Sequence, residues 1–305
     1  MNNSDFQTRL CGRIEEKLKI RIVDMHIPPQ GMSSKVFFVK SDTEKKYAIK
    51  YGNDVTKDVS ALKLIMKEGI DIPVPRLYAS FLFEETPIII LEKINFPLLE
   101  SVSKDQMPKY IPSMIGNLRK LHSIKFDRSG SLIDSKSEKS WKEMLSAIFD
   151  GDEFDWNEIA KREGLDTELV LSSVEKIREK INNTVFEEGN YSLLHTDFNQ
   201  RNLFVDPKSD EITGIIDWEE ALFGDPLYDF ARVRMFMWHF GFDNSSIQAY
   251  YDLMNYTDEQ KALENLYRLV LVIQYLAWYS EDLSEFARGR IKLHQDYLRT
   301  YNWEK

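Results

Sequence analysis

Cysteine is nearly absent from this chain: Cys11 is the single one among 305 residues. One thiol allows no intramolecular disulfide and no cysteine-based metal site. Long apolar runs are missing too, and stretches such as Leu269 to Ile273 are far too short to span a membrane. The first twenty residues lack the apolar core of a secretory signal. We therefore expect a cytoplasmic protein without a membrane partner.

Positive charge is in the minority. The chain has 50 acidic and 40 basic residues, which gives a formal net charge of -10 at pH 7. Such a surface repels phosphate backbones, so nucleic acid is not expected as a partner, and it attracts cations. Because an acidic balance also serves solubility alone, a polycationic ligand and a merely solvated surface both stay open.

The residue pattern changes twice along the chain. Helical spacing over residues 1–20 gives way to short alternating segments over 20–50, which predict a small antiparallel sheet. A helix is predicted at 55–68, and two further strands follow, the second within EETPIIILEKI. Helical patterns then dominate, interrupted by a strand-rich stretch from Tyr191 to Trp218. We predict an α+β protein with a β-rich lobe at 1–94 and a mainly helical lobe at 95–305.

The stretch from residue 193 to residue 231, LLHTDFNQRNLFVDPKSDEITGIIDWEEALFGDPLYDFA, carries the most chemical information. Asp197 lies in His-Thr-Asp, Asn202 follows five residues later, and Asp217 ends an apolar strand. NLFVD and ITGIID flank the polar turn PKSDE, which predicts a hairpin. The hairpin would bring Asn202 and Asp217 close to each other and to Asp197.

This set of side chains suits phosphoryl transfer. That reaction needs positioned phosphates, a metal ion that neutralises charge, and a group that orients the attacking hydroxyl. The oxygens of Asp217 and Asn202 are hard ligands suited to Mg²⁺, and Asp197 can accept the hydroxyl proton. The spacing from Asp197 to Asn202 matches the catalytic loop of protein kinases, with Asp217 as the metal-binding aspartate. His195 is expected to brace the loop.

The same block resembles the aminoglycoside phosphotransferase family of kinase-like small-molecule kinases, and IDWEEALFGDPLYDFA is similar to the hygromycin B phosphotransferase branch. The resemblance implies the bilobal protein-kinase-like fold, ATP or GTP as phosphate donor, and Mg²⁺. It implies that Asp197 is the catalytic base and that Asn202 and Asp217 hold magnesium. Asp225 and Asp229 are expected to brace a loop and cap a helix.

The amino-terminal part resembles the family's nucleotide-binding lobe. Ser33 and Ser34 fall in the nucleotide-covering loop, and Lys50 is the strand lysine that contacts the α- and β-phosphates. Glu92 and Ile94 fall in the hinge that binds the base. The helix after the lysine normally supplies a glutamate partner; here Asp58 is the best candidate, and whether it pairs with Lys50 is left open.

The acceptor is less clear than the phosphate donor. An aminoglycoside is a polycation, and its pocket should present carboxylates, for which the candidates are Glu219, Glu220, Glu281, Asp282 and Glu285. A solvated helical face is the alternative for the last three. Tryptophans 218, 238 and 278 would either form the floor of a sugar site or pack in the core.

Three functions remain open. The first is an antibiotic-resistance kinase that phosphorylates a hydroxyl of an aminoglycoside. The second is a kinase of the same fold that acts on choline, a sugar, an amino sugar or a macrolide. The third is a nucleotide-binding pseudokinase, which would be expected to have lost Lys50, Asp197, Asn202 or Asp217, although all four are present.

Overall fold

The computed structural model describes residues 3–28, 35–52, 55–134, 139–150, 154–282 and 284–303. It divides into two compact units, one formed by Met1–Ile124 with Asp197–Ala221 and the other by Lys125–Thr196 with Leu222–Lys305. Both the lysine strand and the catalytic-loop motif belong to the first unit. The predicted lobe boundary between residues 94 and 95 stays a prediction.

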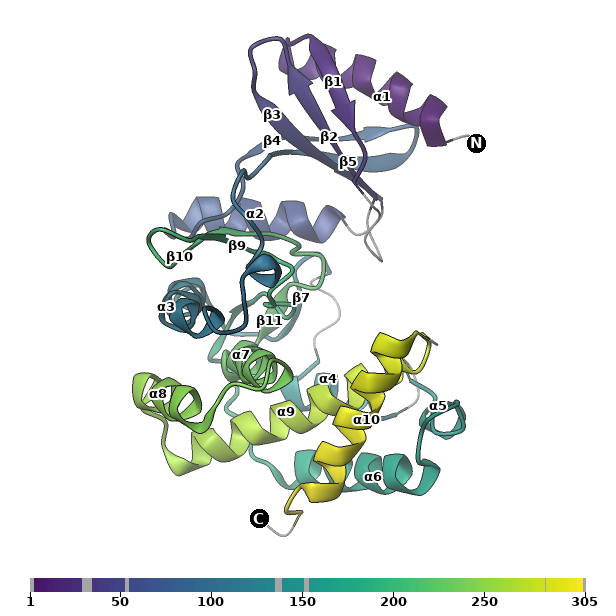
Figure 1. Cartoon of the computed structure of the whole chain (residues 1–305), viewed down its shortest axis with the longest axis vertical. Helices are drawn as coiled ribbons and strands as arrows, with labels where there is room; N and C mark the ends of the chain where they lie inside the picture. Colours follow the sequence, from purple (N-terminus) through teal and green to yellow (C-terminus); the bar gives the residue numbers. More distant parts are fainter. Residues whose placement is uncertain are drawn as a thin grey trace. The chain divides into compact units, whose positions relative to one another are not determined.

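The first unit is built on a five-stranded antiparallel sheet in the order β1-β2-β3-β5-β4. Its strands are β1 (Ile22–His26), β2 (Lys35–Ser41), β3 (Lys46–Tyr51), β4 (Leu77–Phe83) and β5 (Thr86–Glu92). Helix α1 (Asn3–Leu18) lies against this sheet (Figure 1) and packs Leu10 and Ile14 onto Phe37, Val39 and Ile90. The alternating strand pattern and the first helix are confirmed.

Several shorter elements complete the first unit. They are α2 (Val55–Glu68), the 3₁₀ turns at Leu99–Ser101 and Met107–Tyr110, α3 (Ile111–Leu121), β9 (Leu203–Asp206) and β10 (Glu211–Ile215). The helix predicted at 55–68 has the predicted bounds. Leu62 and Ile65 of α2 are buried while Lys63 and Met66 are not, as expected for an amphipathic helix.

The second unit is mainly helical. Its helices are α4 (Trp141–Ala147), α5 (Trp156–Ile159), α6 (Thr167–Asn183), α7 (Leu227–His239), α8 (Asn244–Met254), α9 (Asp258–Tyr279) and α10 (Glu285–Thr300). Helix α9 is its centre and contacts α6, α7 and α10 (Figure 1). From Leu266 to Ile273 every residue of α9 is buried, because neighbouring helices cover it on all sides.

A small four-stranded sheet, in the order β6-β8-β11-β7, joins these helices. It consists of β6 (Lys125–Phe126), β7 (Gly130–Ser131), β8 (Tyr191–Leu194) and β11 (Leu222–Gly224). A Cβ atom at Gly224 would come within 2.4 Å of the Trp141 ring, so only glycine lets β11 pass Trp141 so closely. The sequence pattern did not predict β6, β7 or β11, each of which has only two or three residues.

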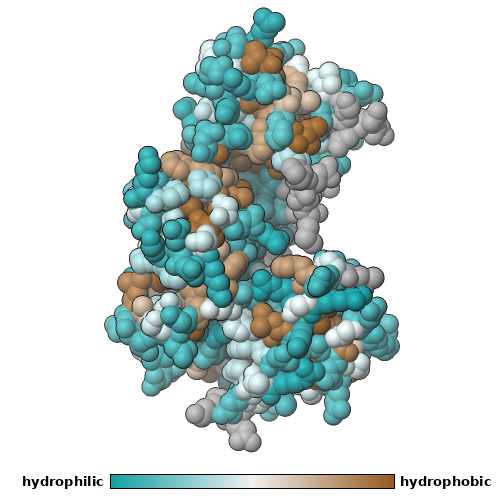
Figure 2. Space-filling model, in the orientation of Figure 1, coloured by the Kyte–Doolittle hydropathy of each residue, from teal (hydrophilic) through white to brown (hydrophobic). Residues whose placement is uncertain are grey.

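The predicted α+β class is confirmed, with an antiparallel sheet in the amino-terminal region and helices in the carboxy-terminal region. On the face seen in Figure 2, hydrophobic residues form small separated patches among hydrophilic ones. In the described part of the chain, no helix combines the length and the apolar character needed to cross a bilayer.

Two histidines contact each other inside the second unit. His294 Nδ1 donates to the carbonyl oxygen of Arg290 (2.7 Å), so in its neutral form His294 Nε2 is an acceptor. His239 Nε2 lies 3.2 Å from it and therefore donates the proton of this contact. Burial lowers the pKa of His294 to about 4 and that of His239 to about 2. The folded protein thus keeps both rings neutral.

This pair predicts acid sensitivity. The unfolded chain takes up a proton on each histidine near pH 6.5, whereas folded His294 does so only near pH 4, so stability falls as the pH drops through this window. Between pH 7 and pH 5, the difference in protonation of His294 should lower the free energy of unfolding by about 2 kcal/mol. We expect the free energy of unfolding of the variant His294→Gln, measured by urea titration, to fall by about 2 kcal/mol less than that of the wild type over the same pH range. An identical pH dependence in both proteins would contradict the assignment.

Candidate active site

The predicted hairpin is confirmed and determines the geometry of the motif. Strands β9 and β10 pair antiparallel, with Asp206 opposite Glu211 and Leu203 opposite Ile215. Just beyond the paired residues, the backbone N–H of Ile216 donates to the carbonyl oxygen of Asn202 (3.0 Å). Because Asn202 precedes β9 and Asp217 follows β10, the hairpin brings these two residues to the same end.

Asp197 is held by two asparagines. Asn202 Nδ2 donates to Asp197 Oδ2 (2.8 Å) and to its carbonyl oxygen (3.0 Å). Asn199 Nδ2 donates to the other carboxylate oxygen, Oδ1, at 2.8 Å. Since the amide nitrogen of Asn202 is directed at Asp197, its side-chain oxygen is the atom left to bind a cation. The carboxylate of Asp197 therefore has a fixed orientation.

The residue before Asp197 adopts a strained backbone conformation. Thr196 has φ +60°, which is uncommon for a β-branched residue. Within the second unit, the buried carboxylate of Asp229 accepts the backbone N–H groups of Thr196 (2.8 Å) and His195 (2.9 Å). These two bonds hold the turn, so the prediction that Asp229 braces the loop is confirmed.

Asp225 caps the helix that carries this brace. Its Oδ1 accepts the backbone N–H of Leu227 (2.8 Å) at the start of α7, as expected for a residue that caps a helix. Its Oδ2 accepts the hydroxyl of Tyr267 (2.7 Å), which in turn accepts the indole N–H of Trp141 (2.8 Å). The prediction for Asp225 is thereby confirmed as well.

Lys50 lies at the centre of three carboxylates. Its Nζ is 2.8 Å from Asp58 Oδ2, 2.5 Å from Asp217 Oδ1 and 3.1 Å from Glu219 Oε2. The pairing with Asp58, which the sequence left open, is therefore present. The other oxygen of Asp58 accepts the backbone N–H of Trp218 (2.9 Å). Asp58 thus connects helix α2 both to the lysine and to the segment that follows Asp217.

Among the described residues that contact one another around Lys50 Nζ, carboxylates outnumber cations. Three carboxylates and one ammonium give a formal charge of −2. Burial by itself would lower the pKa of Lys50, but attraction by Asp58 and Asp217 outweighs it, so this pKa lies above its usual value. Burial raises the pKa of the Asp58 carboxyl. A divalent cation next to Asp217 would cancel the excess negative charge. The carboxylate of Asp217 is partly exposed, so a cation can reach it.

The predicted hinge residues, Glu92 and Ile94, belong to the same unit. Glu92 ends β5, and its backbone N–H donates to the carbonyl oxygen of Arg76 (2.9 Å). Ile94 follows and reaches the hairpin: its Cδ1 lies 2.4 Å from the point where a side chain at position 214 would begin. Only Gly214 lets β10 run this close beneath Ile94. The predicted nucleotide-loop residues Ser33 and Ser34 lie outside the described residues.

The predicted acceptor-binding residues differ in their surroundings. Glu219 is buried in the lysine cluster, and exposed Glu220 lies 3.9 Å from Lys57. Asp282 accepts the backbone N–H (2.8 Å) and the hydroxyl (2.7 Å) of Ser284. Glu285 is exposed in the first turn of α10, while Glu281 lines a cavity. Their contacts with an acceptor stay predictions.

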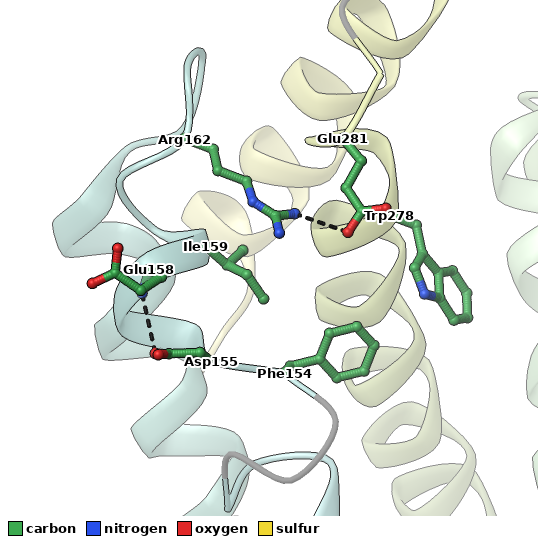
Figure 3. Close-up of a pocket in the computed structure, with 7 residues that line it drawn as sticks. All are labelled: Phe154, Asp155, Glu158, Ile159, Arg162, Trp278 and Glu281. Atoms are coloured by element: carbon green, nitrogen blue, oxygen red, sulfur yellow. Dashed lines mark hydrogen bonds and ion pairs between the residues drawn. The ribbon is translucent and has the colours of Figure 1, made fainter.

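The three tryptophans also differ in their surroundings. Trp218 is fully buried, and its indole N–H donates to the carbonyl oxygen of Ile215 (3.3 Å). Trp238 packs against His294 and Tyr297. Trp278 is 38% exposed and lines the same cavity as Glu281 (Figure 3). Of the three, Trp278 is therefore the one whose surroundings suit a ligand.

The arrangement defines a class of protein. An antiparallel sheet presents a buried lysine, and a hairpin beneath it gathers two aspartates and an asparagine, as in kinase-like phosphotransferases. A model of the phosphotransferase enzyme family matches residues 25–295. Since this is most of the chain, the protein belongs to that family and is a phosphotransferase.

Solved structures have the same fold. The apo form of a thermostable mutant of aminoglycoside phosphotransferase APH(4)-Ia superposes with a TM-score of 0.71 at 17% identity, covering 95% of this chain and 100% of its own. A ternary complex of such a mutant with AMP-PNP and hygromycin B has a TM-score of 0.70 at 17% identity, covering 96% and 99%. The gentamicin complex of APH(2″)-IIa has a TM-score of 0.62 at 19% identity, covering 97% of both. No curated protein sequence matches the chain.

One residue at this site was missed by the sequence reasoning. Asn199 orients Asp197, and its signal was an amide two residues after an aspartate in a turn. The predicted contact of Glu219 with an acceptor stays a prediction, but its contact with Lys50 was not foreseen. That contact joins residues 169 positions apart in the sequence, and no local sequence pattern predicts contacts over such a separation.

Proposed function

We propose that this chain is a Mg²⁺-dependent O-phosphotransferase that moves the γ-phosphate of ATP or GTP to a hydroxyl of a small molecule, with an aminoglycoside as the acceptor. The observation that carries the proposal is that Asn202 ties down the carboxylate of Asp197 at the same hairpin end that presents Asp217 to Lys50. The complex of an APH(4)-Ia mutant with AMP-PNP supports a nucleotide as donor.

Each residue has a role at the phosphate end. Lys50 would bind the α- and β-phosphates together with the loop around Ser33 and Ser34. Asp58 would keep the ammonium group of Lys50 in place. The side-chain oxygens of Asn202 and Asp217 would hold magnesium. When bound, Mg²⁺ neutralises the charge of the transferring phosphoryl group. The backbone groups of Glu92 and Ile94 would bind the nucleotide base.

Asp197 would act on the acceptor. Its carboxylate is half-buried and its orientation is fixed by Asn199 and Asn202. A carboxylate held in this way aligns a hydroxyl for attack and takes its proton as the new oxygen–phosphorus bond forms. The hydroxyl proton thus ends on Asp197, and the nucleoside diphosphate leaves.

A polycationic acceptor agrees with the net charge of -10 and with the hygromycin B and gentamicin complexes of structurally similar enzymes. The residues shared with kinases bind the phosphates and the metal, so they do not identify the acceptor. The competing proposal is therefore a kinase of the same fold that acts on choline, a sugar, an amino sugar or a macrolide. The pseudokinase is the non-enzymatic one.

A coupled nucleotide-turnover assay tests the proposal. We would supply ATP or GTP with Mg²⁺ and compare hygromycin B, kanamycin, gentamicin, choline, simple sugars and a macrolide. We expect rapid turnover with one of the aminoglycosides, and its loss when Mg²⁺ is chelated. Turnover with a non-antibiotic acceptor alone would assign the chain to metabolism. Nucleotide binding without turnover for any acceptor would favour the pseudokinase.

A further inference from the structure

One edge of the five-stranded sheet in the first unit is open. Strand β1 is an outermost strand, and among the described residues its only neighbouring strand is β2 (Figure 1). The start of β1 is anchored, because the backbone N–H of Ile22 donates to the Glu15 carboxylate of α1 (2.7 Å). From Val23 to Ile27 every residue is exposed. An open edge of this kind offers backbone N–H and C=O groups that can pair with another strand.

The two edges of this sheet differ. The opposite edge strand, β4, contacts α1 and exposes two of its seven residues, Ser80 and Leu82. Strand β1 exposes four of its five residues and contains neither lysine nor proline. Lysine, proline and bulges are common means by which edge strands avoid pairing, and β1 has a bulge alone, between Ile22 and Asp24. The edge beyond this bulge is therefore unprotected.

Three apolar side chains of this edge are exposed to water: Val23 (53%), Met25 (39%) and Ile27 (45%). Met25 lies opposite the core residue Val39 of β2, so it belongs to the face against which α1 packs, and Ile27 follows two residues later. Helix α1 reaches this margin of the sheet, because the sulfur of Cys11 lies 3.8 Å from that of Met25. Covering these side chains would remove apolar surface from water, which is favourable.

Two polar residues, Asp24 and His26, alternate with the apolar ones. Asp24 lies opposite Lys40 of β2, and His26 lies opposite Phe38, on which its ring stacks. Lys40 forms an ion pair with Glu44 (2.6 Å). Neither Asp24 nor His26 forms a hydrogen bond or an ion pair with another described residue. Both side chains are therefore available to a partner strand.

The stretch from Val23 to Ile27 is complementary to itself. If it pairs antiparallel with a second copy about Met25, then Met25 faces the partner's Met25, and Val23 faces the partner's Ile27. Asp24 faces the partner's His26, whose imidazole can donate an N–H to the carboxylate, and this contact occurs twice. A shift by two residues would oppose two aspartates or two histidines, and a shift by one would oppose polar and apolar side chains. One register therefore satisfies every position.

We propose that the chain forms a homodimer in which the β1 strands of two copies pair antiparallel across a twofold axis and join the two sheets. The partner is a second copy, because the charges and apolar side chains match the same sequence read in the opposite direction. Two short strands bury much less than the roughly 1,600 Å² of a standard interface, so we expect a dissociation constant in the micromolar range. The dimer needs neither nucleotide nor acceptor and does not depend on the proposed phosphotransferase function.

Sedimentation velocity on the full chain, from about 1 to about 100 µM, provides the first test. We expect the wild type to change from monomer to dimer over this range. Met25→Lys sets two ammonium groups opposite each other at the twofold axis and should raise the dissociation constant at least about tenfold. The matched control is Leu82→Lys, which changes an exposed apolar residue of the opposite edge strand in the same way and should dimerise as the wild type does. A wild type that stays monomeric, or equal effects of the two lysines, would overturn the proposal.

Exchanging the polar residues tests the register. His26→Asp opposes aspartates, Asp24→His opposes histidines, and each change should weaken the dimer about three- to tenfold. The double variant Asp24→His/His26→Asp restores both contacts in reverse and should return to within about twofold of the wild type. Both positions are exposed, so the variants should fold. A double variant weaker than both single ones, or three variants as tight as the wild type, would rule out this pairing.

Cys11 allows a third test, since it is the single thiol of the chain. Its sulfur contacts Met25, and side chains directly opposite each other in an antiparallel pair have Cβ atoms about 5 Å apart. The two thiols of the dimer thus come within reach of a short bismaleimide. We expect a covalent dimer on a denaturing gel, kept in Leu82→Lys and lost in Met25→Lys. If the wild type dimerises but is not linked, the contact lies elsewhere and the proposal fails.

Discussion

Replacing Asp197 by asparagine should lower kcat by about 100- to 10,000-fold, the usual contribution of a positioned general base. Asparagine preserves the shape of the side chain but cannot accept the hydroxyl proton. Nucleotide binding should change little, because Lys50, Asn202 and Asp217 remain in place. Turnover and nucleotide affinity, measured on the same preparation, check both parts of this expectation.

The matched control is Asp206→Asn, which makes the same change nine residues along the chain. Asp206 accepts the backbone N–H of Lys208 (2.9 Å) in the turn of the same hairpin, and asparagine can do the same. This variant should keep wild-type turnover. An Asp197→Asn protein that retains most of its turnover would show that the proton leaves by another route, and the role proposed for Asp197 would be wrong.

Replacing Lys50 by methionine should have two large effects. The first is on stability, because the side chains of Asp58 and Glu219 are only 2% and 10% exposed and would lose their contact with the ammonium group of Lys50. Removing one partner of a buried ion pair typically costs about 3–5 kcal/mol, and we expect that loss of unfolding free energy at pH 7. The second is a fall in kcat of about 100- to 1,000-fold, since a preorganised cationic donor to the phosphates is removed.

The pH and magnesium dependence of this variant make the prediction specific. Without Lys50, the buried carboxyls should take up protons more readily in the folded state than in the unfolded chain. The stability deficit should therefore shrink as the pH falls from 7 to 5. Added Mg²⁺ should stabilise Lys50→Met more than the wild type, because it supplies the missing positive charge.

The same substitution at Lys57 is the control. Lys57 is on the same helix as Asp58 and lies 3.9 Å from the exposed Glu220. Exposed pairs contribute about 0–1 kcal/mol, so Lys57→Met should be nearly silent. If Lys50→Met unfolds at the same urea concentration as the wild type, the carboxylates are compensated by other groups, and the charge count proposed for this cluster is wrong.

Local chemistry follows directly from the amino-acid sequence. Alternating apolar residues in KVFFVK and KYAIK require paired strands, and a polar turn between two short apolar segments requires a hairpin. Asn202 and Asp217 are therefore close in space wherever that hairpin forms. The spacing from Asp197 to Asn202 limits how far apart those two side chains can lie, since only four residues separate them. These features depend on sequence separations that the chain itself restricts.

Long-range partners could not be read in this way. The contact of Asp58 with Lys50 spans eight residues and was only a candidate, because an aspartate replaced the expected glutamate and its reach depends on how α2 packs. Strand β11 has three residues and acquires its partners β7 and β8 only in the folded unit. Glu219 and Glu281 look alike as acidic residues in the sequence, yet one is buried against the lysine and the other lines a cavity.

The sequence by itself therefore determined the family, the kinase-like class of chemistry and the residues at the phosphate end, because these depend on side-chain types at short, fixed spacings. Only the tertiary structure decided which carboxylates surround Lys50, that the turn braced by Asp229 is strained at Thr196, and that Trp278 lines a cavity. Those outcomes depend on burial and on contacts between distant segments, whose free energies arise only when the helices and strands pack.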